Sequence, residues 1–182
     1  MVNLATMASR YVAEGYNELL AESRVCQDIV LKAISESSFD RNVTIKGGVV
    51  MRSITGDVRR ATRDIDFDFI KYSIEQDEYC FDVCYDDEGV SLLMNSKEQI
   101  FAEKLRALVK FGTFSGRVKD IFDLCYLSDY VDKERLMKCL KTYILDDKGM
   151  FENNIEDVRR RIKKIFTDRD FSKAVENSGK DN

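Results

Sequence analysis

Apolar residues recur at helical spacing near the start of the chain and again throughout its second half. Near the start they predict one helix over residues 11–20 and a second helix, or a continuation of the first, over residues 25–34. In the second half, apolar stripes with the same period predict further helices. These stripes span residues 101–108, 118–125, 136–144 and 155–165.

The middle of the chain has the pattern of a small sheet. The β-branched residues 43–45 predict a strand that ends at the pair Gly47 and Gly48, and the apolar residues directly after this pair can open a short helix. Strict alternation of acidic and apolar residues over 64–69 predicts a second strand. Residues 79–85 are a third strand candidate.

This order of elements, helices followed by a small sheet and then by more helices, predicts an α+β fold. With 182 residues, of which 44% are hydrophobic, the chain is long enough for one compact unit with a sizeable core. Within it we expect a sheet-containing core with N-terminal helices over residues 1–95, a helical subdomain over residues 96–176 and a tail over residues 177–182.

The composition excludes several functional classes. The chain has no His, which excludes a histidine base and imidazole metal ligands. Its 29 basic and 33 acidic residues exclude a nucleic-acid-binding protein held by bulk positive charge alone. No run approaches the ~20 apolar residues of a membrane-spanning helix. The five cysteines lack the paired spacing of a disulfide framework, which favours a cytoplasmic location.

The predicted strand over residues 64–69 carries the most informative chemistry. Successive strand side chains point to opposite faces, so Asp64, Asp66 and Asp68 share one face, and we expect the apolar residues between them to pack on a core. Asp is depleted in strands, and like charges on one face repel. Convergence on a cation explains the pattern, since Mg²⁺ takes oxygen ligands and keeps positions for substrate phosphates. The alternative is a surface strand whose acidic face meets water.

Gly47 and Gly48 stand between a predicted strand and a predicted helix. Because they lack side chains, a phosphate can approach the backbone there and be held by N–H groups at the helix N-terminus. Taken alone, a glycine pair is better explained as a tight turn. The order of strand, Gly-Gly, helix, loop and Asp-x-Asp instead predicts a phosphate site beside a metal-binding pair.

This order resembles the nucleotidyltransferase superfamily. Two segments, IKGGVVMRSITGDVRRATRDIDFDF and NSKEQIFAEKLRALVKFGTFSGRVKDIFDLCYL, further resemble the AbiEii/AbiGii toxin family of bacterial toxin–antitoxin and abortive-infection systems. The matching motifs are residues 47–48, 63–66, 102–105 and 117–124. The resemblance implies a nucleotidyltransferase-like fold, with a small mixed sheet, N-terminal helices and a C-terminal helical bundle.

The resemblance also implies roles for matching residues of the first half. Asp64 and Asp66 would hold the catalytic Mg²⁺ and, through it, the nucleoside triphosphate. Gly47, Gly48 and Arg63 would contribute to nucleotide binding. The reaction would be transfer of a nucleotide to an acceptor, with RNA such as the 3′ end of tRNA as the acceptor that the family suggests.

In the second half, the resemblance implies that Lys104 and Asp120 belong to the same catalytic cleft as the metal-binding pair. Lys104 would reach the phosphates, and Asp120 would support the metal, the nucleophile or the lysine. The alternative for Lys104 is a side chain that only extends from an apolar stripe to the surface. Asp123 shares a helix face with Asp120 and could pair with Lys119 or Arg117.

The chain departs from the superfamily pattern in one respect. A third carboxylate usually lies on a later strand, and here the segment between Asp68 and Lys97 is short, with Asp82 as the only candidate. One hypothesis is a Mg²⁺-dependent toxin that transfers a nucleotide from an NTP to RNA. A second is a shortened, non-catalytic module that binds nucleotide or an antitoxin protein. A third is a helical interaction protein whose acidic strand is incidental.

Overall fold

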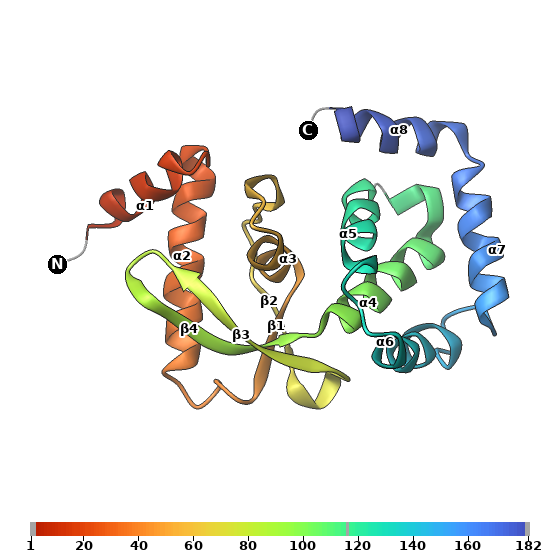
Figure 1. The fold of residues 1–182 in the computed structure, drawn as a ribbon, viewed down its shortest axis with the longest axis horizontal. Helices are drawn as coiled ribbons and strands as arrows, with labels where there is room; N and C mark the ends of the chain where they lie inside the picture. Colours follow the sequence, from red (N-terminus) through yellow and green to blue (C-terminus); the bar gives the residue numbers. More distant parts are fainter. Residues whose placement is uncertain (1–2, 116, 181–182) are drawn as a thin grey trace. The chain divides into compact units, whose positions relative to one another are not determined.

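The computed structural model describes residues 3–115 and 117–180 of the chain. The chain divides into two compact units, Met1–Ser96 and Lys97–Asn182. The first unit combines helices with a sheet, and the described part of the second is helical (Figure 1). None of the helices within the described ranges combines the length and the apolar composition that a bilayer crossing requires.

Two helices begin the first unit, α1 (Leu4–Ala13) and α2 (Glu18–Ser35). The single helix predicted over residues 11–20 is wrong, because the chain breaks between α1 and α2. Gly15 adopts a positive φ of 102° there, a conformation that favours glycine. The Asn17 side chain then caps α2 by accepting a hydrogen bond from a backbone N–H of its first turn.

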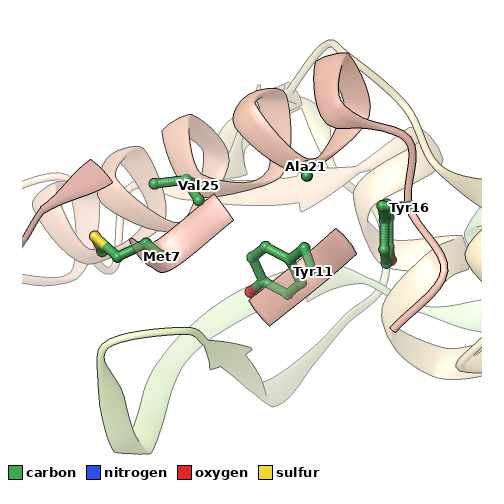
Figure 2. Close-up of a cluster of buried hydrophobic side chains, with 5 residues drawn as sticks. All are labelled: Met7, Tyr11, Tyr16, Ala21 and Val25. Atoms are coloured by element: carbon green, nitrogen blue, oxygen red, sulfur yellow. The ribbon is translucent and has the colours of Figure 1, made fainter. Parts of the chain in front are cut away.

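The apolar residues on the two sides of this break form one cluster (Figure 2). Met7 and Tyr11 of α1 are buried with Tyr16 of the connection and with Ala21 and Val25 of α2. The rings of Tyr11 and Tyr16 meet edge to face, with centroids 5.6 Å apart. The hydrophobic spacing therefore reflects a core shared by two helices rather than one continuous helix.

Four strands form a mixed sheet in the order β2-β1-β4-β3. They are β1 (Val43–Lys46), β2 (Asp66–Phe69), β3 (Gln76–Val83) and β4 (Asp86–Asn95). β1 runs parallel to β4, whereas the β1–β2 and β3–β4 pairs are antiparallel. Helix α3 (Gly47–Thr55) follows β1 directly. The predicted α+β fold with a small mixed sheet is confirmed.

β4 is a central strand that the sequence analysis did not predict, and the candidate over residues 79–85 corresponds to β3. In β4, Val90, Leu92 and Met94 alternate with other residues and are at most 3% exposed. This two-residue period could have identified the strand from the sequence, but the acidic residues at its start interrupt the pattern. The short segment between Asp68 and Lys97 therefore contains two strands, β3 and β4, which pair as an antiparallel hairpin.

β2 differs from its predicted form in two ways. It begins at Asp66, two residues later than the alternation suggested. Its aromatic side chains do not pack on a core: Phe67 is 51% exposed and Phe69 is 47% exposed. β2 is an edge strand, and the face that carries these two rings is left partly uncovered.

The second unit is built on α4 (Lys97–Phe111), which packs against α5 (Val118–Ser128), α6 (Lys133–Leu140) and α7 (Ile155–Phe166). The four predicted stripes fall within these helices, the third continuing from α6 into a π-helical turn, Lys141–Leu145. A further helix, α8 (Arg169–Lys180), was not predicted. It runs through residues 177–180, which the sequence suggested as the start of a tail.

Candidate functional site

The junction between β1 and α3 is the centre of the candidate site. Gly47, the first residue of α3, has a positive φ of 70°, which is costly for a residue with a side chain. Lys46 occupies the N-cap position and forms no side-chain hydrogen bond to the helix. The N–H groups of a first helical turn have no partner within the helix and attract anions. The start of α3 therefore offers backbone N–H groups to an anion such as a phosphate.

Asp66 lies directly against this junction. A Cβ atom at Gly47 would overlap Oδ2 of Asp66 and would lie 3.2 Å from its Cβ and Cγ atoms. Lys46 and Asp66 are also partners in the antiparallel β1–β2 ladder. The register of two strands thus sets a carboxylate beside the N-terminus of α3. The predicted neighbourhood of the glycine and the acidic motif is present in the structure.

Asp68, on the same strand, has a different environment. Its Oδ1 lies 2.7 Å from Nζ of Lys46, and Nδ2 of Asn95 lies 3.4 Å from its Oδ2. The ammonium group offsets the charge that would attract a cation. Asp68 is therefore the least suited of the three acidic residues to hold a metal.

Asp64 lies outside the ladder, in the loop before β2, and its side chain is exposed, like that of neighbouring Arg63. The loop is fixed from α2, because Nε2 of Gln27 donates hydrogen bonds to the carbonyl oxygens of Thr62 and Asp64 at 2.8 and 3.3 Å. The expectation that strand alternation orients Asp64 is wrong. Gln27 holds the loop instead, and no local sequence signal identifies that residue.

Asp64 and Asp66 offer the ligand chemistry that Mg²⁺ prefers. Both carboxylates are exposed, and no side chain in the described part of the chain is recorded in an ion pair with either. Within residues 3–115 and 117–180, no group of three or more acidic or cysteine side chains is arranged to hold a metal. Two carboxylates suit an ion that completes its shell with water and triphosphate oxygens. The residues present fit a metal that binds together with its substrate.

The third-carboxylate candidate lies elsewhere in the sheet. Asp82 is exposed on β3, the edge strand opposite to β2. Three strand spacings of about 4.8 Å separate the two edges, which amounts to roughly 14 Å. The structure therefore does not bring Asp82 together with Asp66.

Gly48 has a different neighbour from the one expected. A Cβ atom at Gly48 would lie 2.7 to 3.0 Å from the side-chain atoms of Thr62. The space at this glycine is therefore taken by the loop that leads to Asp64. Because Gly48 has no side chain, α3 and this loop can approach closely, in addition to any role of Gly48 in ligand binding.

The second unit holds the other two predicted residues. Nζ of Lys104, on α4, lies 2.7 Å from Oδ1 of Asp120 and 2.8 Å from Oδ2 of Asp123, both on α5. The side chains of Lys104 and Asp123 are only 15% and 2% exposed. Arg117 also contacts Asp120, at 3.1 Å. Lys104 and Asp120 are thus brought together, and Asp123 contacts Lys104, a partner that the sequence analysis had not considered.

The comparison with protein families identified one family. The sequence profile of the nucleotidyl transferase AbiEii toxin of the type IV toxin–antitoxin system matches residues 29–82 and 72–179. Among curated proteins and among solved structures, no significant match was found. The two family matches together span most of the chain, including Gly47, Asp66, Lys104 and Asp120. The chain therefore belongs to the AbiEii family of nucleotidyl transferase toxins.

Proposed function

We propose that this chain transfers a nucleotide from an NTP to an RNA acceptor, such as the acceptor end of tRNA, in a Mg²⁺-dependent reaction. The observation that supports the proposal most directly is the contact between Asp66 and Gly47. It sets a carboxylate suited to a metal beside backbone N–H groups suited to a phosphate, and a metal-bound triphosphate needs both.

The reaction would be an in-line displacement at the α-phosphate. A hydroxyl oxygen of the acceptor forms the new bond to the α-phosphorus and releases its proton to solvent water. The bond from the α-phosphorus to the bridging oxygen breaks, so that pyrophosphate leaves. Asp64 and Asp66 would hold Mg²⁺, which when bound supplies positive charge next to the attacking and leaving oxygens. The N–H groups at the start of α3 would orient the phosphates, together with Arg63.

Lys104 and Asp120 complete the proposed catalytic set, and both lie in the part of the chain that the family profile matches. The lysine would donate to phosphate oxygens on which charge develops, and Asp120 would keep it oriented through the 2.7 Å contact. As the toxin of a type IV toxin–antitoxin system, the chain would act in the cytoplasm, and an antitoxin partner would oppose its action.

The second candidate function is a non-catalytic module that binds nucleotide or the antitoxin. It is favoured by the position of Asp82, which leaves the described part of the site with two carboxylates instead of three. Binding of a nucleotide without its turnover would distinguish this candidate from the enzyme.

The test is incorporation of label from each of the four NTPs into total tRNA, with and without Mg²⁺. If the chain is the proposed enzyme, label should appear in a band of tRNA size only when Mg²⁺ is present. The rate of incorporation by Asp66→Asn should then be at least 100-fold lower than that of the parent. The matched control is Asp87→Asn, which makes the same chemical change on the exposed start of β4. Saturable nucleotide binding without incorporation would establish the binding module instead.

Growth provides a separate test of toxicity. Overexpression of the parent chain should arrest growth, and Asp66→Ala should relieve the arrest at equal protein level. Arrest that persists in the Asp66→Ala strain would show that toxicity does not depend on nucleotide transfer.

A further inference from the structure

A polar pocket lies in the first unit, at the end of α3 far from Gly47. It is a cavity of about 340 Å³ lined by Arg10 of α1, Arg24 of α2 and Arg52 and Ser53 of α3, among others. The nine residues of α3 span about 13 Å, so the pocket is separate from the junction that holds Asp66. Its volume is within the usual range of small-molecule sites.

Arg52 is the residue that makes this pocket unusual. Its side chain is buried, with the residue 4% exposed, and its only side-chain hydrogen bond in the described part of the chain runs from Nη1 to Oε1 of Gln27, at 2.6 Å. Nη2 is buried and forms no hydrogen bond. A buried guanidinium paired only with a neutral amide is costly, and a buried donor without a partner commonly marks a missing ion or water.

Arg24 adds a second buried guanidinium, with the residue 7% exposed. Its Nε lies 3.5 Å from Oδ1 of buried Asp28, and its Nη2 donates to the carbonyl oxygen of Asp82 at 2.8 Å. Nη1 is buried and forms no hydrogen bond, and the geometry at Nε and the facing Asp28 oxygen is not that of a hydrogen bond either. The guanidinium also lies over the ring of Tyr11, 5.2 Å from its centroid. Asp28 therefore offsets the charge of Arg24 and leaves that of Arg52 uncompensated.

The rim of the pocket carries charges of both signs. Arg10 is exposed and donates to the carbonyl oxygen of Cys84, while the exposed residues Glu14 and Asp82 also contribute to the lining. Exposed carboxylates interact with their surroundings through water, whereas the two inner guanidinium groups are shielded from it. The inner end of the pocket therefore favours an anion.

We propose that this pocket binds a phosphate-class oxyanion between Arg52 and Arg24. Guanidinium groups match phosphate oxygens in geometry and form short, charge-assisted hydrogen bonds with them. The anion would accept hydrogen bonds from the guanidinium groups that line the pocket and would balance the buried charge of Arg52. The ligand can be free phosphate or the phosphoryl group of a nucleotide, which share this chemistry.

The site is connected to the loop that carries Asp64. Gln27 accepts from Arg52 through its Oε1 and donates to the carbonyl oxygens of Thr62 and Asp64 through its Nε2. An anion that immobilises Arg52 would thereby also stabilise the loop. The effect of the anion on the Asp64 loop rests on the proposed function. Anion binding itself does not, because it is measured without turnover.

The experiment is calorimetric titration of the full chain with inorganic phosphate, in a buffer free of oxyanions. Phosphate should bind the parent chain and raise its melting temperature by roughly 5 °C or more at 100 times its Kd. Arg52→Met should lose binding at least tenfold. Ser53→Glu, which places a carboxylate in the lining of the pocket, should also lose binding, and it keeps the test valid if Arg52→Met does not fold. Ser38→Glu adds the same charge to an exposed loop and should bind like the parent.

Two further measurements identify the source of the bound phosphate group and test the connection between the pocket and the loop that carries Asp64. If adenosine 5′-monophosphate competes with phosphate while adenosine does not, the phosphoryl group of a nucleotide is an accepted ligand; absence of competition assigns the pocket to free phosphate. Phosphate should also slow amide hydrogen exchange over residues 62–66 in the parent but not in Gln27→Leu. No phosphate binding by the folded parent, or equal binding by the parent and Ser53→Glu, would overturn the proposed site.

Discussion

The carboxylate of Asp66 occupies the space that a side chain at Gly47 would need. The two residues are nineteen positions apart in sequence, and the antiparallel ladder joins them by pairing Lys46 with Asp66. Gly47 also has a positive φ of 70°. The glycine is thus required twice, once by its backbone conformation and once by the acid beside it.

Replacement of Gly47 by Ala should abolish nucleotide transfer, because the new methyl group displaces the Asp66 carboxylate. Because alanine disfavours the positive φ at this position, the variant should also have a free energy of unfolding about 1–2 kcal/mol lower than that of the parent. Label incorporation and urea unfolding measure the two effects separately.

Gly56→Ala is the matched control for this change. Gly56 caps the other end of α3 with a φ of 66°, and no atom lies within 4 Å of the position of an added Cβ. This variant should show the same backbone cost without the clash and should retain its turnover. Equal loss of turnover in both variants would contradict the role of the Asp66–Gly47 contact.

Lys104→Met should lower both turnover and stability. Removal of the ammonium group leaves the buried Asp123 carboxylate without that partner, and breaking a buried ion pair in this way typically costs about 3–5 kcal/mol. Chemical denaturation and label incorporation provide the two readouts.

A double variant separates the structural part from the catalytic part. Lys104→Met with Asp123→Asn should recover much of the stability, because the unpaired charge is gone, while turnover stays at least tenfold below that of the parent. Lys110→Met, on the exposed part of α4, should change stability by no more than about 0.5 kcal/mol. Recovery of turnover in the double variant would show that Lys104 is structural.

Tyr11→Phe should destabilise the first unit. The Tyr11 hydroxyl donates a 2.5 Å hydrogen bond to Oδ2 of Asp28, a residue with no exposed surface. Loss of the donor leaves that oxygen with only the N–H of Cys84, at 3.0 Å, at an expected cost of about 1–3 kcal/mol. Thermal unfolding tests this, with Tyr130→Phe as the control because Tyr130 is 56% exposed. Equal melting temperatures for the two variants would contradict the expectation.

The stability of the first unit should fall at alkaline pH. Burial, with a further contribution from Asp28, raises the pKa of the Cys84 thiol from its ordinary 9.0 to about 11. Because the folded state holds this proton more tightly than the unfolded state, the contribution is complete below pH 9 and is lost as the pH rises towards 11. Burial also raises the pKa of the Tyr11 hydroxyl, so that its contribution is lost above pH 10.

Unfolding by urea between pH 8 and 11 measures this dependence. Cys84→Ala should show a shallower decline between pH 9 and 11 than the parent. Cys26→Ala, which removes an exposed thiol of the same unit, should decline as steeply as the parent. Identical slopes for Cys84→Ala and the parent would rule out the linkage.

The local part of the site was accessible from the sequence. The β-branched residues before Gly47 and the apolar residues after Gly48 identified the strand and the helix on either side of the junction. Short-range signals of this kind depend on neighbours in the chain. The alternation over residues 64–69 identified Asp64 and Asp66, whereas Lys104 and Asp120 were identified only by the resemblance to a family whose motifs are contiguous in the chain.

The surroundings of these residues were decided by tertiary structure alone. The sequence contains the acidic alternation, but only the folded unit makes β2 an edge strand and leaves Phe67 and Phe69 exposed. Likewise, Lys46 offsets Asp68, and Gln27 connects Arg52 with the loop of Asp64, across separations of more than twenty residues. Such contacts depend on register and packing, whose energies are summed over the whole unit and leave no pattern in any one segment. The chain therefore encodes its motifs locally, and the folded unit determines which charges are balanced and which remain available to bind a ligand.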